Sequence, residues 1–141
     1  MLGIAAFGAA AKDGYASLAT ELPRLTELRR CAEERLGTLP VKLHLPKGAR
    51  APHILNFALP DIKSETMVHE LSKSGICVSG GSACSTHSRS LSRSLLAFGV
   101  PEREVECSIR VSLGRFNTKE DIDALCDALE SAIAHLVRIH R

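Results

Sequence analysis

The last third of the chain restricts the fold more than any other feature, because an alternating segment is followed by a strongly amphipathic one. Residues 107–113 place Ile109, Val111 and Leu113 on one face of an extended strand, since side chains alternate between the two faces of a strand. From residue 119 onward, apolar residues recur at helical spacing and form one stripe: Ile122, Leu125, Leu129, Ile133, Leu136 and Val137. A strand and a helix that each have one apolar side predict a layer of helices packed on a sheet.

Start and stop signals divide the rest of the chain into helices and strands. A helical pattern runs from about residue 4 to 36, where Gly14 and Pro23 are candidate interruptions and Gly37 is a candidate C-cap. The other predicted elements are strands at 41–45, 53–59 and 76–78, a helix from Ser64 to Gly75, a loop at 79–90, a helix at 91–98 ended by Gly99, and a final helix capped by residues 117–121.

These elements predict an α+β fold in a single domain that spans residues 1–141. We expect a small, mostly antiparallel sheet of about four strands with helices packed on one face. A chain of 141 residues is long enough for one core, and it contains neither an internal repeat nor an interdomain linker. Residues 1–13 form an apolar helix start that has too few polar side chains to face water on all sides, so we expect it to rest on another surface.

Charge and cysteine content narrow the function classes. The formal net charge of +2 gives no reason to expect a nucleic-acid partner. Lys12 and Asp13 end the apolar start well short of the roughly 20 residues that a membrane span needs, so no membrane partner is expected. Five cysteines without a C-x-x-C pair argue against a disulfide framework and favour a reducing, cytoplasmic location.

Cys84 lies in the stretch of the sequence that is least able to form a core. Its neighbours are small or polar: Gly80, Gly81, Ser82, Ala83, Ser85 and Thr86. Such neighbours leave a thiol accessible, and the cations Arg89 and Arg93, with His87, favour the thiolate where they are also close in space. Cys84 is therefore a candidate nucleophile and His87 a possible accessory residue. A flexible loop that happens to contain a cysteine remains the alternative.

The other cysteines and histidines show no pattern of a reactive or metal site. Cys31, Cys77 and Cys126 are expected to be small packing residues, and Cys107 is ambiguous at the start of a strand. A zinc site made of Cys77, Cys84, His87 and Cys107 matches no common ligand spacing, so no metal is expected. The histidines of the first half of the sequence are expected at the surface or at strand edges: His44, His53 and His69.

Arg110 lies on the face of the 107–113 strand opposite Ile109 and Val111. A solvated strand face explains this position. A planar, bidentate clamp for a substrate carboxylate explains it as well.

Two segments, taken together and in this order, resemble the cysteine desulfurases, which belong to the class V branch of the fold-type-I pyridoxal-phosphate enzymes. They are residues 75–85, with Gly-Gly-Ser-Ala-Cys ending at Cys84, and residues 108–118, which begin Ser-Ile-Arg. Residues 3–8 and 52–56 are also similar to that family, so the resemblance covers nearly the whole chain. It implies the small C-terminal domain of such an enzyme.

The resemblance also implies a reaction and its participants. L-cysteine is the substrate and pyridoxal phosphate is the electron sink. Cys84 is implied to attack the substrate sulfur and hold it as a persulfide, while Arg110 binds the substrate carboxylate. A sulfur acceptor protein is implied as the partner that takes the sulfur from Cys84.

Two departures from the family pattern limit what the chain is expected to do alone. Residues 85–91 differ from the family's usual sequence after the cysteine. None of the lysines lies in the Ser/His-rich context of the family's Schiff-base lysine: Lys12, Lys42, Lys47, Lys63, Lys73 and Lys119. We therefore expect the C-terminal portion of a desulfurase that is inactive alone, binds no pyridoxal phosphate alone, and pairs with a large-domain chain or a second copy. A stand-alone, non-enzymatic persulfide carrier or partner-binding module remains open.

Overall fold

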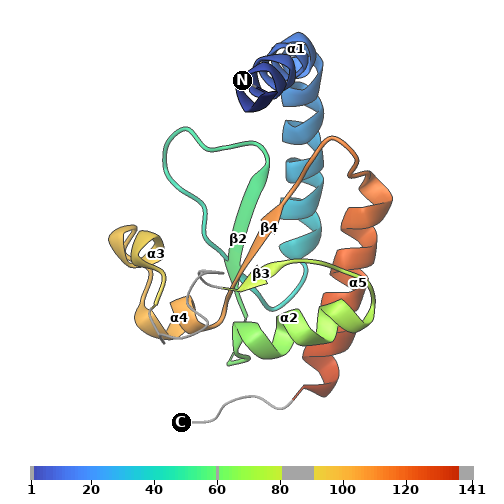
Figure 1. The fold of residues 1–141 in the computed structure, drawn as a ribbon. Coiled ribbons are helices and arrows are strands. Elements are labelled where there is room, and N and C mark those ends of the chain that lie inside the picture. The colour runs from blue at the N-terminus through green and yellow to red at the C-terminus, as the bar shows by residue number, and fades with distance from the viewer. Residues whose placement is uncertain (1, 60, 81–90, 137–141) are drawn as a thin grey trace.

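The computed structural model describes residues 2–59, 61–80 and 91–136, in which the longer helices pack on one side of a four-stranded sheet (Figure 1). Its elements are α1 (Leu2–Leu36), β1 (Lys42–Leu43), β2 (Ile54–Ala58), α2 (Ser64–Lys73), β3 (Ser79–Gly80), α3 (Arg93–Ala97), α4 (Glu102–Glu106), β4 (Ser108–Ser112) and α5 (Lys119–His135). Among the described residues, no helix is long and apolar enough to cross a membrane.

The sheet has the strand order β1-β2-β4-β3, and every neighbouring pair is antiparallel. Strands β2 and β4 form its centre, where Leu55 is paired with Val111 and Phe57 with Ile109. These four side chains are buried because they share the face that the helices cover. The predicted α+β fold with a small antiparallel sheet is confirmed.

The three longer helices, α1, α2 and α5, supply the other half of the core. Helix α5 contacts both α1 and α2, as their adjacent positions in Figure 1 show, and the buried residues of α1 lie in its C-terminal half. In the apolar stripe predicted for the last helix, Ile122, Leu125, Leu129 and Ile133 are buried. Leu136, at the C-cap of α5, is only partly buried against the core, and Val137 lies outside the described residues. The short helices α3 and α4 lie at the other side of the strands in Figure 1.

The secondary structure adds to or differs from the sequence-based expectations at three points. The first helix continues through Gly14 and Pro23, although in Figure 1 its first turns run across the direction of its C-terminal half, as expected where proline removes a backbone donor. The strand predicted at 76–78 is wrong, because the pairing with β4 begins only at Ser79. Helix α4 was not expected; its five residues are too few to show a helical period.

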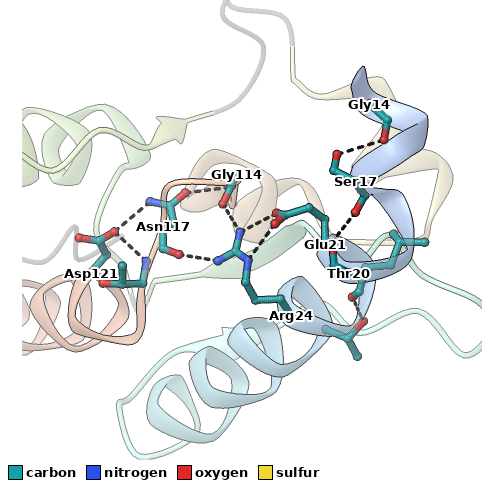
Figure 2. A network of polar contacts seen from close by, with 11 residues as sticks. Gly14, Ser17, Thr20, Glu21, Arg24, Gly114, Asn117 and Asp121 are labelled. Atoms are coloured by element: carbon teal, nitrogen blue, oxygen red, sulfur yellow. Dashed lines mark hydrogen bonds and ion pairs between the residues drawn. The ribbon is translucent and has the colours of Figure 1, made fainter. Parts of the chain in front are cut away.

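Arg24 ties α1 to the turn that follows β4 (Figure 2). Its Nη1 donates to the Asn117 carbonyl at 2.7 Å, and its Nη2 donates to the Gly114 carbonyl at 3.0 Å and to Glu21 Oε2 at 2.8 Å. The turn is closed further by the Asn117 side chain, whose Oδ1 accepts from the Gly114 N–H at 2.8 Å. Asp121 Oδ2 in turn accepts from the Thr118 N–H at 3.0 Å at the start of α5. The end of β4 is thereby fixed to α1.

Candidate functional site

A row of polar residues, one from each strand of the sheet or its immediate extension, crosses the face that the long helices leave uncovered. Arg110 of β4 lies opposite Asn56 of β2 on one side and opposite Ser79 of β3 on the other. His44 directly follows β1, and its backbone N–H donates to the Asn56 carbonyl at 2.9 Å. We call His44, Asn56, Arg110 and Ser79 the polar row.

Arg110 carries a charge that nothing in the described part of the chain neutralises. The side chain is exposed, and its guanidinium Nη2 makes one long hydrogen bond, at 3.5 Å, to Ser79 Oγ. By contrast, most other described arginines pair with Asp or Glu: Arg24, Arg29, Arg30, Arg35, Arg50, Arg103 and Arg115. An unpaired planar fork is suited to bind an external carboxylate with two hydrogen bonds.

His44 was expected at the surface or at a strand edge. It does directly follow the edge strand β1, but its side chain is only 11% exposed. Its Nδ1 lies 2.6 Å from Asn56 Oδ1 and its Nε2 lies 3.4 Å from Glu104 Oε2. The Lys42 ammonium, 2.6 Å from Glu104 Oε1, together with His44, holds the pKa of the Glu104 carboxyl below its ordinary value despite some burial. His53 and His69 are exposed, as expected.

The family of the chain follows from its sequence and its fold together. The model of the Aminotransferase class-V family matches residues 2–125. The chain belongs to the class-V aminotransferase family. The cysteine desulfurase IscS of Dictyoglomus turgidum is 37% identical over 138 residues, which cover 95% of this chain and 34% of that protein. IscS 1 of Archaeoglobus fulgidus is 34% identical over 134 residues, which cover 94% of this chain and 35% of that protein.

Solved structures agree with these relatives. The NifS-like protein of Rickettsia africae has a TM-score of 0.81 and 29% identity, and the match covers 96% of this chain and 35% of that one. A second NifS-like protein has a TM-score of 0.73 and 26% identity. The resemblance to cysteine desulfurases is confirmed, and this class-V aminotransferase chain spans about a third of the length of the relatives that it matches.

Class-V aminotransferases use pyridoxal phosphate, but the described residues do not fit a binding site for it. The cofactor is held as a Schiff base by a lysine, and none of the six lysines lies on β2, β3 or β4, the strands that surround Arg110. They lie instead on α1, β1, the β1–β2 connection, α2 and its N-cap, and α5. Lys42, the one lysine within a strand, has its ammonium paired with Glu104 at 2.6 Å. A cofactor facing Arg110 would need its lysine from elsewhere.

Cys84 and His87, the predicted nucleophile and its possible accessory, lie outside the described residues. The structure therefore brings neither of them to Arg110 nor separates them from it. Ser79, which contacts Arg110, precedes Cys84 by five positions in the sequence.

His44 and Asn56 were missed as site residues because only the sheet register, which is a long-range property, places them in one row with Arg110.

The described cysteines differ sharply in exposure. Cys126 is buried and Cys31 is partly buried, as expected of packing residues, and Cys107 is also buried. Burial raises the pKa of both the Cys107 and the Cys126 thiols. Cys77 was expected to pack within a strand, but it is exposed, whereas its neighbours Ile76 and Val78 pack against the core. Nowhere in the described ranges do three or more His, Cys, Asp or Glu side chains gather as a metal site.

Alkylation of the folded chain with iodoacetamide near pH 8 is therefore expected to modify Cys77 well before Cys107 and Cys126. The buried thiols are shielded, and their raised pKa values keep them protonated, so they lack the reactive thiolate. Peptide mass spectrometry at successive times measures the order. Urea-unfolded protein is the control, in which all cysteines should react at similar rates. Equal rates in the folded chain would contradict the burial of Cys107 and Cys126.

A second cluster of charges lies beside β1 and the end of β2, but its cations are already paired. An open hollow of about 500 Å³ is bordered by Lys42, Arg103 and Cys107, among others. Lys42 pairs with Glu104, and Arg103 pairs with Asp61. Because these cations are already neutralised, Arg110 is the better candidate for an anion site.

Proposed function

We propose that the chain is the C-terminal portion of a cysteine desulfurase-like protein in which Cys84 accepts sulfur and Arg110 binds the carboxylate of L-cysteine. The observation that carries the proposal is the unpaired guanidinium of Arg110 on the uncovered face of the sheet. Ser79 beside it opens the segment of chain that leads to Cys84. Substrate recognition and sulfur acceptance would thus be joined by one short stretch of sequence.

The net reaction balances without an external oxidant. The carbon–sulfur bond of L-cysteine breaks, a sulfur–sulfur bond forms on Cys84, and the remaining carbon takes a proton to give L-alanine. Pyridoxal phosphate, held by residues beyond those described here, supplies the electron sink that makes this bond cleavable. Arg110 orients the substrate by its carboxylate, and Cys84 leaves the reaction as a persulfide that a sulfur acceptor protein discharges.

The start of α1 supports a partner that carries the cofactor. Leu2, Ile4 and Phe7 are 91%, 77% and 78% exposed, and burying such side chains is worth about 1.5–3 kcal/mol each. We propose that residues 1–13 pack on the large, cofactor-binding domain, supplied by the same polypeptide or by another one.

A chimera tests the proposal. The chain replaces the matching third of Dictyoglomus turgidum IscS, and alanine release from L-cysteine is measured. We expect turnover that Cys84→Ser abolishes and that Arg110→Gln impairs through an at least tenfold higher KM, because one charge-assisted pair is worth about 1.5–3 kcal/mol. Arg30→Gln, which removes an exposed arginine on α1 that pairs with Glu27, is the matched control and should leave KM unchanged.

An assay of the isolated chain distinguishes a portion of a desulfurase from a stand-alone persulfide carrier. With pyridoxal phosphate and L-cysteine it should release no alanine, since the described lysines do not fit the cofactor. Two results together would favour a stand-alone persulfide carrier instead. The chimera would be inactive, and the isolated chain would take sulfur on Cys84 from a separate active desulfurase. Full activity of the Cys84→Ser chimera would refute the assignment of the nucleophile.

A further inference from the structure

We propose that His44 is a positioning residue, which holds the Asn56 side chain in place and so keeps the Arg110 guanidinium free for the substrate carboxylate. The proposal rests on the proposed function, because it concerns the same carboxylate site. It adds to that function two residues, His44 and Asn56, whose roles follow from the geometry of the polar row.

Asn56 and Arg110 are direct neighbours whose side chains stand close together. The Leu113 N–H donates to the His53 carbonyl and the Leu59 N–H donates to the Cys107 carbonyl, so these are hydrogen-bonded pairs of the β2–β4 ladder. Such pairs alternate with non-hydrogen-bonded pairs, and counting inward places Asn56 and Arg110 in a non-hydrogen-bonded pair. Side chains of such pairs approach each other more closely, with Cβ atoms about 4.5–5.5 Å apart.

Both ends of the Asn56 amide are engaged, and neither end engages Arg110. Oδ1 lies 2.6 Å from His44 Nδ1, while Nδ2 donates to the Ile109 carbonyl at 3.0 Å. Because Nδ2 is the donor end of the amide, Oδ1 accepts from the N–H of His44 Nδ1. Oδ1 is the strong acceptor of the Asn56 side chain, and it is therefore not available to the Arg110 guanidinium. If His44 were absent, Oδ1 would be unsatisfied in a partly buried position and would be free to accept from Arg110.

His44 is itself held in place from two sides. Its backbone N–H is bonded to the Asn56 carbonyl, and its ring Nε2 faces Glu104 Oε2 at 3.4 Å. Glu104, on α4, is oriented by Lys42 on β1. The charged groups around the ring therefore come from α4 and β1, and β2 contributes only the neutral amide. A mostly buried ring with these contacts has little freedom to release Asn56.

The consequence is a cation whose neighbours in the row are neutral and weakly bonded to it. On one side Arg110 has the hydroxyl of Ser79 at 3.5 Å, and on the other side it has an amide committed elsewhere. An incoming carboxylate then replaces no strong internal hydrogen bond. In a variant that frees Asn56 Oδ1, the carboxylate competes with a neutral hydrogen bond worth about 0.5–1.5 kcal/mol, which corresponds to a roughly 2- to 12-fold loss of affinity.

The Arg110 side chain reports this competition directly. The full chain is labelled with nitrogen-15, the Arg110 Nε–Hε resonance is assigned by its loss in Arg110→Lys, and acetate is titrated at constant ionic strength against chloride. In the unmodified chain the resonance should move with acetate more than with chloride. In His44→Phe it should already be displaced without acetate, and the apparent Kd for acetate should rise about 2- to 12-fold.

Rescue and control variants distinguish positioning from a loss of fold. His44→Phe combined with Asn56→Leu removes the competing acceptor and should restore acetate binding, and His44→Gln, which keeps an N–H donor, should restore it in part. His53→Phe, which changes an exposed histidine next to β2, should bind acetate like the unmodified chain. Recovery in the double variant also shows that the ring itself is not needed for folding.

Failure of this inference is distinguishable from failure of the proposed function. If acetate moves the Arg110 resonance equally in the unmodified chain and in His44→Phe, His44 has no positioning role although the carboxylate site stands. If acetate has no more effect than chloride on the unmodified chain, and Arg110→Gln leaves the KM of the chimera unchanged, the carboxylate site itself is refuted.

Discussion

Replacing Phe57 with alanine is expected to lower the free energy of unfolding by about 3–5 kcal/mol. Phe57 is fully buried in the middle of β2, where it lies opposite Leu43 of β1 and Ile109 of β4. It is the largest side chain among the fully buried residues of a core that is otherwise mostly aliphatic. Its removal leaves a cavity that a rigid sheet cannot close, and the lost contacts add to the lost transfer free energy.

Urea denaturation followed by circular dichroism measures this loss. Ile54→Ala is the matched control, because Ile54 lies on the same strand but is 38% exposed, so we expect a loss of only about 1 kcal/mol or less. A loss below about 1 kcal/mol for Phe57→Ala would show that β2 is not the centre of the core.

Gly80→Ala is expected to cost about 1–3 kcal/mol through overpacking, and to disturb the polar row as well. A Cβ at position 80 would lie 2.8 Å from Ser64 Cβ and 2.9 Å from Ser64 Oγ. Ser64 is buried at the start of α2, so it cannot swing away, and β3 must move instead. Because Ser79 precedes Gly80 in β3, its contact with Arg110 should weaken.

The combination with Ser64→Gly isolates this clash. Removing the Ser64 side chain from the Gly80→Ala variant should recover part of the lost stability, which urea denaturation of the single and double variants measures as a coupling free energy. Gly48→Ala is the control, since a Cβ there meets nothing within 4 Å. Additive effects of the two substitutions would show that β3 and α2 do not pack as described.

Local periodicity predicted the parts of the fold that depend on local sequence. The face of β4 that carries Arg110 and the buried stripe of α5 followed from spacing alone, because alternation and helical repeat are properties of a single element. The same reasoning placed the third strand at 76–78 because Ile76 and Val78 are apolar. These two residues do contact the core, but the residues that pair with β4 are Ser79 and Gly80. No pattern within residues 76–80 carries the position of that partner.

The candidate site shows the same division. Arg110 stood out through its place on a strand, and Cys84 through its unusual neighbours. The roles of Arg110, Cys84 and His87 remain predictions. His44 and Asn56 lie 12 positions apart in sequence and more than 50 from Arg110, and only the paired register of three strands makes them neighbours. An expectation of surface histidines was reasonable for a short edge strand, but α4, which sequence reasoning missed, covers His44 through Glu104.

The strand that carries Arg110 is held at both of its ends. At its start the Ser108 hydroxyl donates to the Glu104 carbonyl at 2.7 Å, and beyond its end Arg24 holds the Gly114 and Asn117 carbonyls. The backbone under the guanidinium therefore loses its conformational entropy when the domain folds and not when a ligand arrives. A carboxylate that binds there needs to immobilise only the side chain of Arg110, which leaves more of the interaction free energy as affinity.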